Sequence, residues 1–420
     1  MAVKDDSWTV TTLKECARWY SGGTPNTSIA EYWNGDIPWI TASSLHDFYI
    51  KNSERRVTPL GIANGTRLIP KDTILFIVRG MSLKTEFRVG ITRRPMAFGQ
   101  DCKALVAKDG VDPLFLANVL RAKSEEILGF VDEASHGTGR LATDALEKLE
   151  ILFPPLAEQK AIAHILGTLD DKIELNQQMN QTLEAIARAL FKSWFIDFDP
   201  VRAKLDGRQP AGMDAETAAL FPAEFEDGGA IGKIPKGWKI QDLSDLAKIL
   251  SGKRPSERSP EPTAEMPIPL FGGGGVMAYV KDPLYREPIL LTGRVGTLGL
   301  VFRIAKPCWT SDNTLIILPK QTFNYEFLYF QLREIRFESL NRGSTQPLVT
   351  QGDLTKQQFV VSDALLLQAF HQITSLLYKR FEINSDETES LTSIRDALLP
   401  KLLSGEIRVQ DAETVVERVV

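Results

Sequence analysis

A stripe of apolar residues runs through the stretch from Pro154 to Phe195, in alternating steps of four and three residues. This spacing is the a/d seam of a coiled-coil heptad, so it predicts one long helix that pairs with another helix. The stretch holds no proline after Pro155 and one glycine, Gly167. Such a helix would be on the order of 55 Å long, too long for half of a small core, so we expect a strut. The seam consists of Ile162, Leu166, Leu169, Ile173, Leu183, Ala187, Leu190 and Trp194.

A second stretch near the end of the chain repeats this pattern, including its polar interruption. A shift of 208 residues sets Ile173 on Phe381 and Asn176 on Asn384. A buried polar residue in a seam costs stability but can fix register and partner. Because the polar break recurs with the apolar stripe, we favour an internal repeat over two unrelated amphipathic helices. The predicted helix-pairing residues are Ile173, Asn176, Leu183, Leu190, Phe381, Asn384, Leu391 and Leu398.

The parts between the struts also repeat. Residues 7–25 and 237–255 superpose at a shift of 230, with Trp8 on Trp238. The runs DTILFIVRG (72–80) and EPILLTGRVG (287–296) are short apolar segments bounded by Gly or Pro, which predict strands in a twisted or barrel-like sheet. Each copy continues with a short helix (113–122, 325–334) and a glycine-containing polar loop (135–143, 342–350).

The sequence therefore predicts an α+β fold in the order globule, strut, globule, strut. We expect two mixed α/β domains separated by two long helices that pair as an antiparallel coiled coil, with a pseudo-two-fold internal repeat. Prolines, glycines and acidic residues in 197–235 predict a linker with short helical turns. The expected parts are 1–153 (first domain), 154–196 (central helix), 197–235 (linker), 236–362 (second domain), 363–408 (C-terminal helix) and 409–420 (tail).

Charge and cysteine usage narrow the function. The net charge of −5 argues weakly against simple polyanion binding, but residues 51–108 hold twelve Lys/Arg against four Asp/Glu. No run of roughly 18 apolar residues indicates a membrane span, and no signal peptide is visible. Three widely spaced cysteines predict neither a disulfide framework nor a metal site, and favour the reducing cytoplasm.

Motifs for catalysis are not found. The glycine runs at 271–276 and 293–299 lack the Lys-Ser/Thr of a P-loop and predict tight turns. Four scattered histidines, including His136, make no metal-binding pattern. We expect no catalytic residue, no metal and no cofactor bound by this chain, which favours recognition over chemistry.

Four motifs together resemble the specificity subunit of Type I restriction-modification enzymes. They are FPPLAEQKAIA (153–163), SWFIDFDPVRAK (193–204), IPKGW (234–238) and SIRDALLPKLLSGEI (393–407). The resemblance covers the chain in order, including its duplicated plan. It departs at 362–368, where SDALLLQ stands in place of a PPLAEQ-like helix start.

The resemblance implies a non-catalytic subunit whose two target-recognition domains each read one half of a bipartite, asymmetric DNA sequence. The helices would set the gap and dock two methyltransferase subunits that methylate adenine, and restriction subunits would complete an ATP-dependent endonuclease. S-adenosylmethionine, ATP and Mg would be used by those partners. A protein-binding scaffold with two globular heads remains an alternative, and sequence-specific DNA binding separates the two.

DNA contacts need Lys or Arg at phosphates, and Arg, Asn or Gln at base edges. Taken singly, each such residue is more often a solvated surface charge, but as a set they predict one basic strip in each globule. In the first globule the candidates are Arg55, Arg56, Arg67, Arg79, Lys84, Arg88, Arg93, Arg94 and Arg140. In the second they are Lys253, Arg254, Arg258, Arg286, Arg294, Arg303, Arg342 and Gln346.

Overall fold

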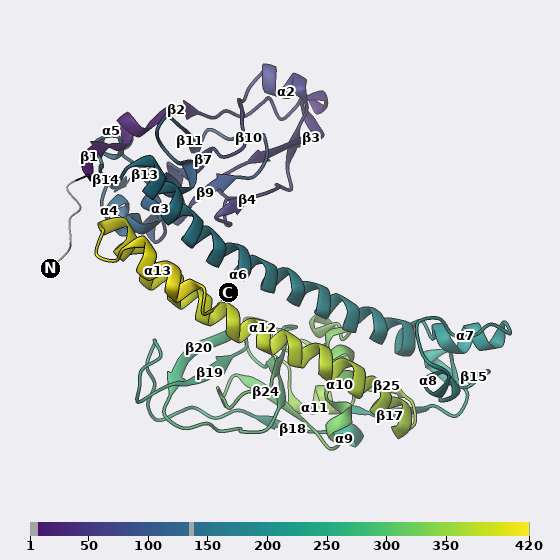
Figure 1. The fold of residues 1–420 in the computed structure, drawn as a ribbon. Helices are drawn as coiled ribbons and strands as arrows, with labels where there is room; N and C mark the ends of the chain where they lie inside the picture. The colour runs from purple at the N-terminus through teal and green to yellow at the C-terminus, as the bar shows by residue number, and fades with distance from the viewer. Residues whose placement is uncertain (1–6, 134–137, 420) are drawn as a thin grey trace. The chain divides into compact units, whose positions relative to one another are not determined.

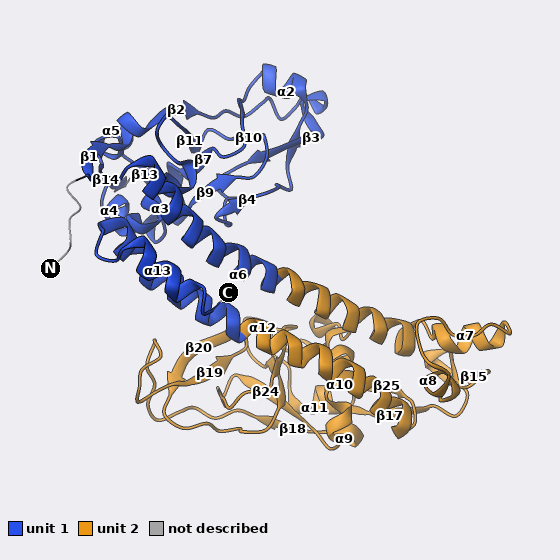
Figure 2. Ribbon diagram, viewed as in Figure 1, with its two compact units in different colours: residues 1–177, 386–420 blue, residues 178–385 orange. Residues whose placement is uncertain are grey.

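The computed structural model describes residues 7–133 and 138–419 (Figure 1). The chain divides into two compact units, which are unit 1 (1–177 and 386–420) and unit 2 (178–385) (Figure 2). Helices and strands are mixed in each unit, so the α+β class is confirmed. The division passes through both long helices, α6 (Leu156–Phe191) and α12 (Ala364–Ser404), so each unit combines a sheet domain with half of each helix.

Unit 1 is built on a five-stranded sheet whose middle strand has four consecutive buried residues, as expected of a strand covered on both faces. The sheet order is β2 (Ala17–Ser21), β11 (Cys102–Ala107), β7 (Ile74–Ile77), β9 (Val89–Thr92) and β4 (Tyr49–Ile50). The other sheets are β5 (Arg56–Val57), β3 (Trp33–Ile40), β10 (Met96–Phe98) and β6 (Leu68–Ile69); β12 (Val131–Glu133), β13 (Gly139–Leu141) and β8 (Arg79–Gly80); and β1 (Thr9–Thr12) with β14 (Glu150–Phe153).

Short helices cover this sheet. Helix α3 (Pro113–Ala122) starts with Pro113 in its first turn, and the Asp112 side chain accepts from the Phe115 N–H, which caps it. The remaining helices of unit 1 are α1 (Leu13–Cys16), α2 (Pro59–Ala63), α4 (Ser124–Leu128), α5 (Thr143–Glu147) and α13 (Val409–Val416).

Unit 2 repeats the order of the first four strands of that sheet. Its strands are β18 (Ala247–Ser251), β24 (Thr314–Pro319), β21 (Ile289–Gly293) and β22 (Val301–Ile304), with β22 at the edge. The smaller sheets are β20 (Gly275–Val280), β19 (Ile268–Gly272) and β23 (Trp309–Thr310); β17 (Lys239–Asp242) and β25 (Gln358–Val361); and β15 (Phe225–Asp227) and β16 (Lys233–Pro235). Its short helices are α7 (Asp199–Leu205), α8 (Ala215–Ala219), α9 (Leu243–Leu246), α10 (Tyr325–Arg333) and α11 (Gln351–Thr355).

The segment 197–235, which we expected as a linker, is folded into unit 2. Val201 and Phe221 are buried in the core of that unit. The Trp194 and Phe221 rings pack edge to face with centroids 5.1 Å apart. The sequence did not predict this packing, because the few apolar residues of the segment are too widely spaced to form a periodic pattern.

The two helices run antiparallel, and the polar breaks in their seams form specific hydrogen bonds. In unit 1 the buried Asn176 donates to Glu387 at 2.9 Å. In unit 2 the buried Asn384 donates to Asn180, also at 2.9 Å, and Asn180 donates to the Phe381 carbonyl. Among the other predicted pairing residues, Ile173, Leu391 and Leu398 are buried in the core of unit 1, Leu190 packs against that of unit 2, and Leu183 is half-buried.

Within the described ranges, no helix combines the length and the apolar character that crossing a bilayer demands. Cys16, Cys102 and Cys308 are all buried and unpaired as disulfides. Burial raises the pKa of the Cys16 thiol to about 11 and that of Cys102 to about 12, so both are held as unreactive thiols.

Candidate nucleic-acid interface

Two arginines stand directly opposite each other in the three-stranded sheet of unit 1. Arg79 on β8 and Arg140 on β13 are paired in antiparallel register, so their side chains share one face. Both residues are exposed, and neither guanidinium has a hydrogen-bond or ion-pair partner among the described residues. Like charges in this position repel each other and destabilise the sheet unless an acceptor-rich partner binds there.

Two glycines allow these strands to come together. Gly80 and Gly139 are register partners next to the arginine pair. A Cβ on Gly139 would lie 2.9 Å from the Leu83 Cβ, closer than real side chains approach, and Gly80 has a φ of +154°. The two glycines therefore allow β8 and β13 to approach closely beside the two arginines.

The third strand of this small sheet adds a carboxylate to the row. Asp132 on β12 is the register partner of Arg140 on the side away from Arg79. The row therefore reads acid, base, base across three strands. Asp132 could not be predicted from the sequence, because cross-strand neighbours are set by strand register and not by spacing along the chain.

The other predicted basic residues of unit 1 differ in exposure and in their side-chain partners. Arg55 lies over the Trp33 ring at 4.3 Å and over Trp39 at 4.8 Å, and Arg67 lies over Tyr20 at 4.9 Å. These arginines are exposed, as are Lys84 and Arg94, whereas Arg56, Arg88 and Arg93 are half-buried. Arg56 donates to Asn52, Arg88 is paired with Glu86, and Arg93 lies over Tyr49 and reaches Asp171 of α6.

Arg93 therefore links the sheet to α6, since it lies over Tyr49 of β4 and pairs with Asp171 of the helix. Of the loop predicted over 135–143, residues 135–137, with His136, lie outside the described residues.

In unit 2, Arg294 lies one residue away from the position that is equivalent to Arg79 of unit 1. The Val78 N–H donates to the Asp101 carbonyl at 2.9 Å, and the Arg294 N–H donates to the Asn313 carbonyl at 2.8 Å. The Val78 carbonyl also accepts a hydrogen bond from the Leu141 N–H, and the Arg294 carbonyl accepts one from the Val349 N–H. Arg294 is therefore the counterpart of Val78 and not of Arg79.

This shift changes the chemistry of the equivalent row. Val295 and Leu348 form the antiparallel bridge of unit 2 that corresponds to the Arg79 and Arg140 pair of unit 1. Moving one residue along extended backbone sends a side chain to the opposite face. Arg294 is accordingly half-buried, and its Nε is buried without a hydrogen-bond partner.

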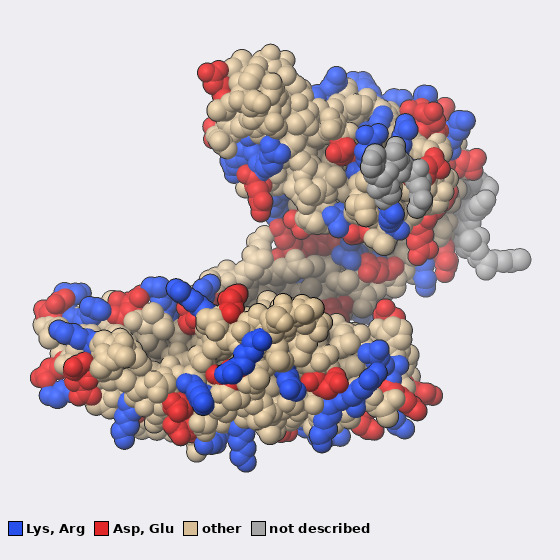
Figure 3. Space-filling model, turned by 180° about the vertical axis from the view of Figure 1, so that it is seen from behind, with Lys and Arg blue, Asp and Glu red and all other residues tan. Residues whose placement is uncertain are grey.

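Most remaining predicted residues of unit 2 lie on its surface. Lys253, Arg254, Arg258, Arg286 and Gln346 are exposed. On the face drawn in Figure 3, basic side chains of each unit are interleaved with acidic ones.

Arg342 is exposed but committed to Asp353, to which its Nε donates at 2.8 Å. Burial opposes ionisation of Asp353, but hydrogen bonds from Thr350 and Arg342 outweigh burial and lower its pKa to about 2.

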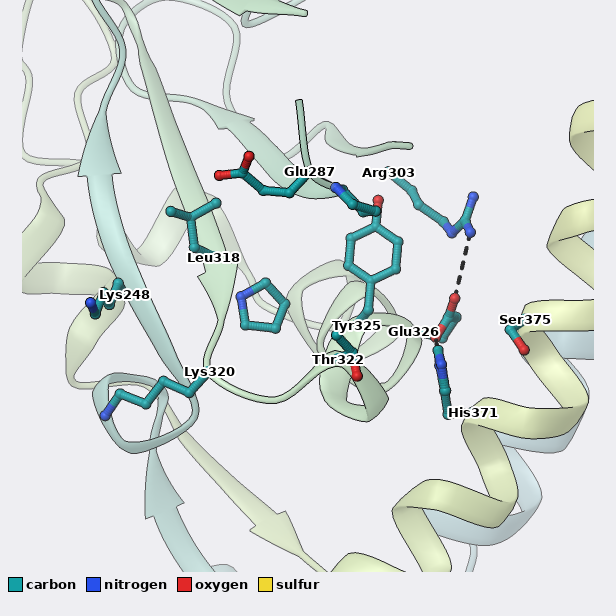
Figure 4. Close-up of a pocket in the computed structure, with 12 residues that line it drawn as sticks. Lys248, Glu287, Arg303, Leu318, Lys320, Thr322, Tyr325, Glu326, His371 and Ser375 are labelled. Atoms are coloured by element: carbon teal, nitrogen blue, oxygen red, sulfur yellow. Dashed lines mark hydrogen bonds and ion pairs between the residues drawn. The ribbon is translucent and has the colours of Figure 1, made fainter. Parts of the chain in front are cut away.

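Arg303 differs from the exposed basic residues, because its guanidinium is held in ion pairs inside unit 2. Its side chain is 13% exposed and is ion-paired with Glu382 of α12 at 2.6 Å. It is also ion-paired with the buried Glu326 of α10 at 3.5 Å (Figure 4). His371 of α12 contacts the other oxygen of Glu326, and the Arg303 guanidinium lies 4.2 Å from the Tyr378 ring. Arg303 therefore fastens the sheet of unit 2 to α12, a role that its position in a strand-like sequence could not reveal.

The same cluster borders a hollow of about 700 Å³ between the sheet and α12, lined also by Leu318 and Lys320. Burial opposes the charged form of Arg303, but Tyr325, Glu326 and Glu382 outweigh burial and raise its pKa above the ordinary arginine value. The described residues contain no group of three or more His, Cys, Asp or Glu side chains that could hold a metal ion.

Comparison with known proteins identifies a family whose sequence model matches this chain. The model of the Type I restriction modification DNA specificity domain matches residues 5–185 and 235–362. The Type I restriction enzyme MjaIX specificity subunit of Methanocaldococcus jannaschii is 29% identical, over 96% of this chain and 94% of its own length. The HindI specificity subunit of Haemophilus influenzae is 31% identical, over 70% of this chain and 77% of its own length.

A solved structure has a similar fold. The crystal structure of the Type-I restriction-modification system S subunit from M. genitalium matches with a TM-score of 0.60 at 18% identity. The match covers 96% of this chain and 98% of that chain.

Proposed function

This chain belongs to the family of Type I restriction-modification DNA specificity subunits, and from that membership we propose that it selects the DNA target of such a system. The chain is the recognition component, and the chemistry belongs to partner subunits. We propose that the sheet domain of each unit binds one half of a bipartite, asymmetric duplex sequence. The observation that carries this proposal is that the family domain is matched twice, and that its main sheet recurs with the same strand order in both units.

The basic residues at the surface supply the affinity in this proposal. Exposed Lys and Arg side chains neutralise phosphates and release counterions, so binding should weaken steeply as salt rises. The unpartnered arginines Arg79 and Arg140 support the interface in unit 1. Lys253, Arg254 and Arg258, which are exposed beyond β18, support the interface in unit 2.

The long helices would set the gap between the two half-sites. Helix α6 has 36 residues and α12 has 41, and each contributes to both units. At 1.5 Å per residue the helices are about 54 and about 60 Å long. The Asn180–Asn384 hydrogen bond supports a fixed register, because a slipped pairing would separate the buried Asn384 amide from its acceptor.

Exposed apolar residues on the helices support docking of two methyltransferase subunits. In unit 2, Leu376 is 69% exposed and Ile383 is 49% exposed, and their spacing of seven residues places them on one face of α12. Leu175 and Ile186 of α6 are also exposed. Large apolar side chains on a helix surface favour burial against a partner.

In this assembly the partners use S-adenosylmethionine for adenine methylation, and ATP and Mg²⁺ for restriction. We propose that this chain binds none of them and that restriction subunits join through the methyltransferase subunits. Its place of action would be the cytoplasm, which suits three buried free cysteines.

The test is selection from a random duplex library by the complex of this chain with its methyltransferase subunits. We expect two short blocks of fixed sequence separated by a gap of fixed length, with affinity that falls as salt increases. Enrichment of no sequence, with an intact complex, would overturn the proposal and favour a protein-binding scaffold.

A further inference from the structure

The row of Asp132, Arg140 and Arg79 in unit 1 is arranged for base edges. Directly opposed residues of antiparallel strands have Cβ atoms roughly 4.5–5.5 Å apart, and stacked base pairs are about 3.4 Å apart. Because arginine stems are long and flexible, the two guanidinium groups can therefore reach neighbouring base pairs. Each guanidinium can donate two parallel hydrogen bonds, and guanine offers the matching O6 and N7 acceptors in the major groove.

The carboxylate in the row argues against a strip that merely binds phosphate. Asp132 is exposed and is the register neighbour of Arg140. A carboxylate repels the phosphate backbone, but it accepts a hydrogen bond from the N4 amino group of cytosine. The row is therefore complementary to guanine and cytosine edges together, and poorly suited to phosphates alone.

Unit 2 has no such row at the equivalent place. Val295 and Leu348 occupy the counterpart positions, and Arg294 is shifted toward the interior. Apolar side chains cannot read guanine acceptors, although they can contact a thymine methyl group. The two halves of the target must therefore be read by different chemistry at this place.

We infer that Arg79 and Arg140 read the guanines of two neighbouring G·C pairs in the half-site bound by unit 1, with Asp132 accepting from a cytosine beside them. This inference rests on the proposed function, because it needs a duplex target. It assigns two specificity-determining residues and a base composition to one half-site.

The experiment uses the full chain in complex with its methyltransferase subunits and the duplex that library selection identifies. Binding is measured by fluorescence anisotropy for wild type, Arg79→Lys and Arg140→Lys. Lysine keeps the charge but loses the two-pronged geometry, so we expect each variant to bind the target about 10- to 100-fold more weakly. Affinity for a scrambled duplex should stay unchanged. Arg18→Lys, at an exposed arginine of β2 outside the row, is the matched control.

A second arm replaces single guanines of the half-site with 7-deazaguanine, which lacks the N7 acceptor but leaves every phosphate in place. At the guanine that Arg79 reads, this base should weaken wild-type binding, and it should weaken the binding of Arg79→Lys by less. If the lysine variants bind the target as wild type does, or if 7-deazaguanine is without effect, the arginines contact phosphates and the inference is overturned. A selected half-site without neighbouring G·C pairs also overturns it, while leaving the proposed function intact. Failure of wild type to prefer any duplex would instead defeat the proposed function itself.

Discussion

Asn384 and Asn180 form a hydrogen bond in unit 2, in which the Asn384 amide nitrogen donates to the Asn180 side-chain oxygen at 2.9 Å. Asn384 is fully buried, and Asn180 in turn donates to the Phe381 carbonyl and to Ser385. These hydrogen bonds join α6 to α12 in this alignment, and a slipped pairing would break them. A pair of this kind costs stability relative to an apolar seam, but it specifies the register.

Asn384→Ala should destabilise unit 2 by about 1–3 kcal/mol, because it removes a buried partner of Asn180. Urea unfolding followed by circular dichroism measures this change. Gln181→Ala, at an exposed position of α6 next to Asn180, is the control and should alter the unfolding free energy by less than about 0.5 kcal/mol. Equal stability of Asn384→Ala and wild type would show that the pair does not fix the helices.

Arg303→Ala should lower stability by about 3–5 kcal/mol, because it leaves the carboxylate of Glu326 buried without its charged partner. Arg254→Ala, at an exposed position of the same unit, should be nearly neutral. Thermal unfolding of the two variants checks this difference. If Arg303→Ala unfolds like wild type but loses affinity for one half-site, Arg303 is a DNA contact after all.

The long helices and the internal repeat could be predicted because both depend on local periodicity. The seam through Ile173 and Leu183 repeats every seven residues, and the polar break at Asn176 recurs at Asn384. Such a pattern depends only on the order of residues along the chain, so it can be recognised without knowledge of tertiary contacts.

The candidate interface could be predicted only as a set of basic residues. The pairing of Arg79 with Arg140 joins strands that are about 60 residues apart in the chain, and strand register is decided by tertiary packing. The runs that contain Arg79 and Arg294 look alike in the sequence, but Arg294 is the counterpart of Val78, and a shift of one residue reverses the face of a side chain. Arg303 is typical of a surface arginine in the sequence, and only the position of Glu326 and Glu382 shows that it is internal.

Stability should fall as pH decreases from about 4 toward 2, in part through Asp353. The pKa of this carboxyl is lowered from 3.8 to about 2 in the folded chain, because its hydrogen bonds to Thr350 and Arg342 outweigh the effect of burial. A lowered folded pKa means that the contribution is complete above the unfolded value and disappears as pH falls through the folded value. Urea unfolding from pH 6 to pH 2.5 measures the effect.

Asp353→Asn cannot titrate, so its stability deficit relative to wild type should be largest near pH 6 and should shrink toward pH 2.5. A deficit that stays constant over this range would show that Asp353 contributes through packing and not through its charge.

Seven residues inserted into both helices, after Gln177 in α6 and after Ser385 in α12, should lengthen the gap in the DNA target. A whole heptad keeps the seam in phase, and it adds about 10 Å of helix, equivalent to at most about three base pairs. Library selection with the extended chain measures the new gap. An insertion of four residues in α6 alone is the out-of-phase comparison, and it should change the gap or prevent assembly. An unchanged gap in an intact complex would show that the helices do not set the spacing.

We propose that this one chain directs methylation to a target with two halves. Base-resolution mapping of methylated adenines, in cells that produce this chain with its methyltransferase subunits, tests it most directly. We predict methylation confined to one bipartite sequence with a gap of fixed length, and the loss of that sequence when Arg79 and Arg140 are both replaced by alanine. Unmodified adenines in cells where the subunits copurify, or methylation without a bipartite sequence, would contradict the account.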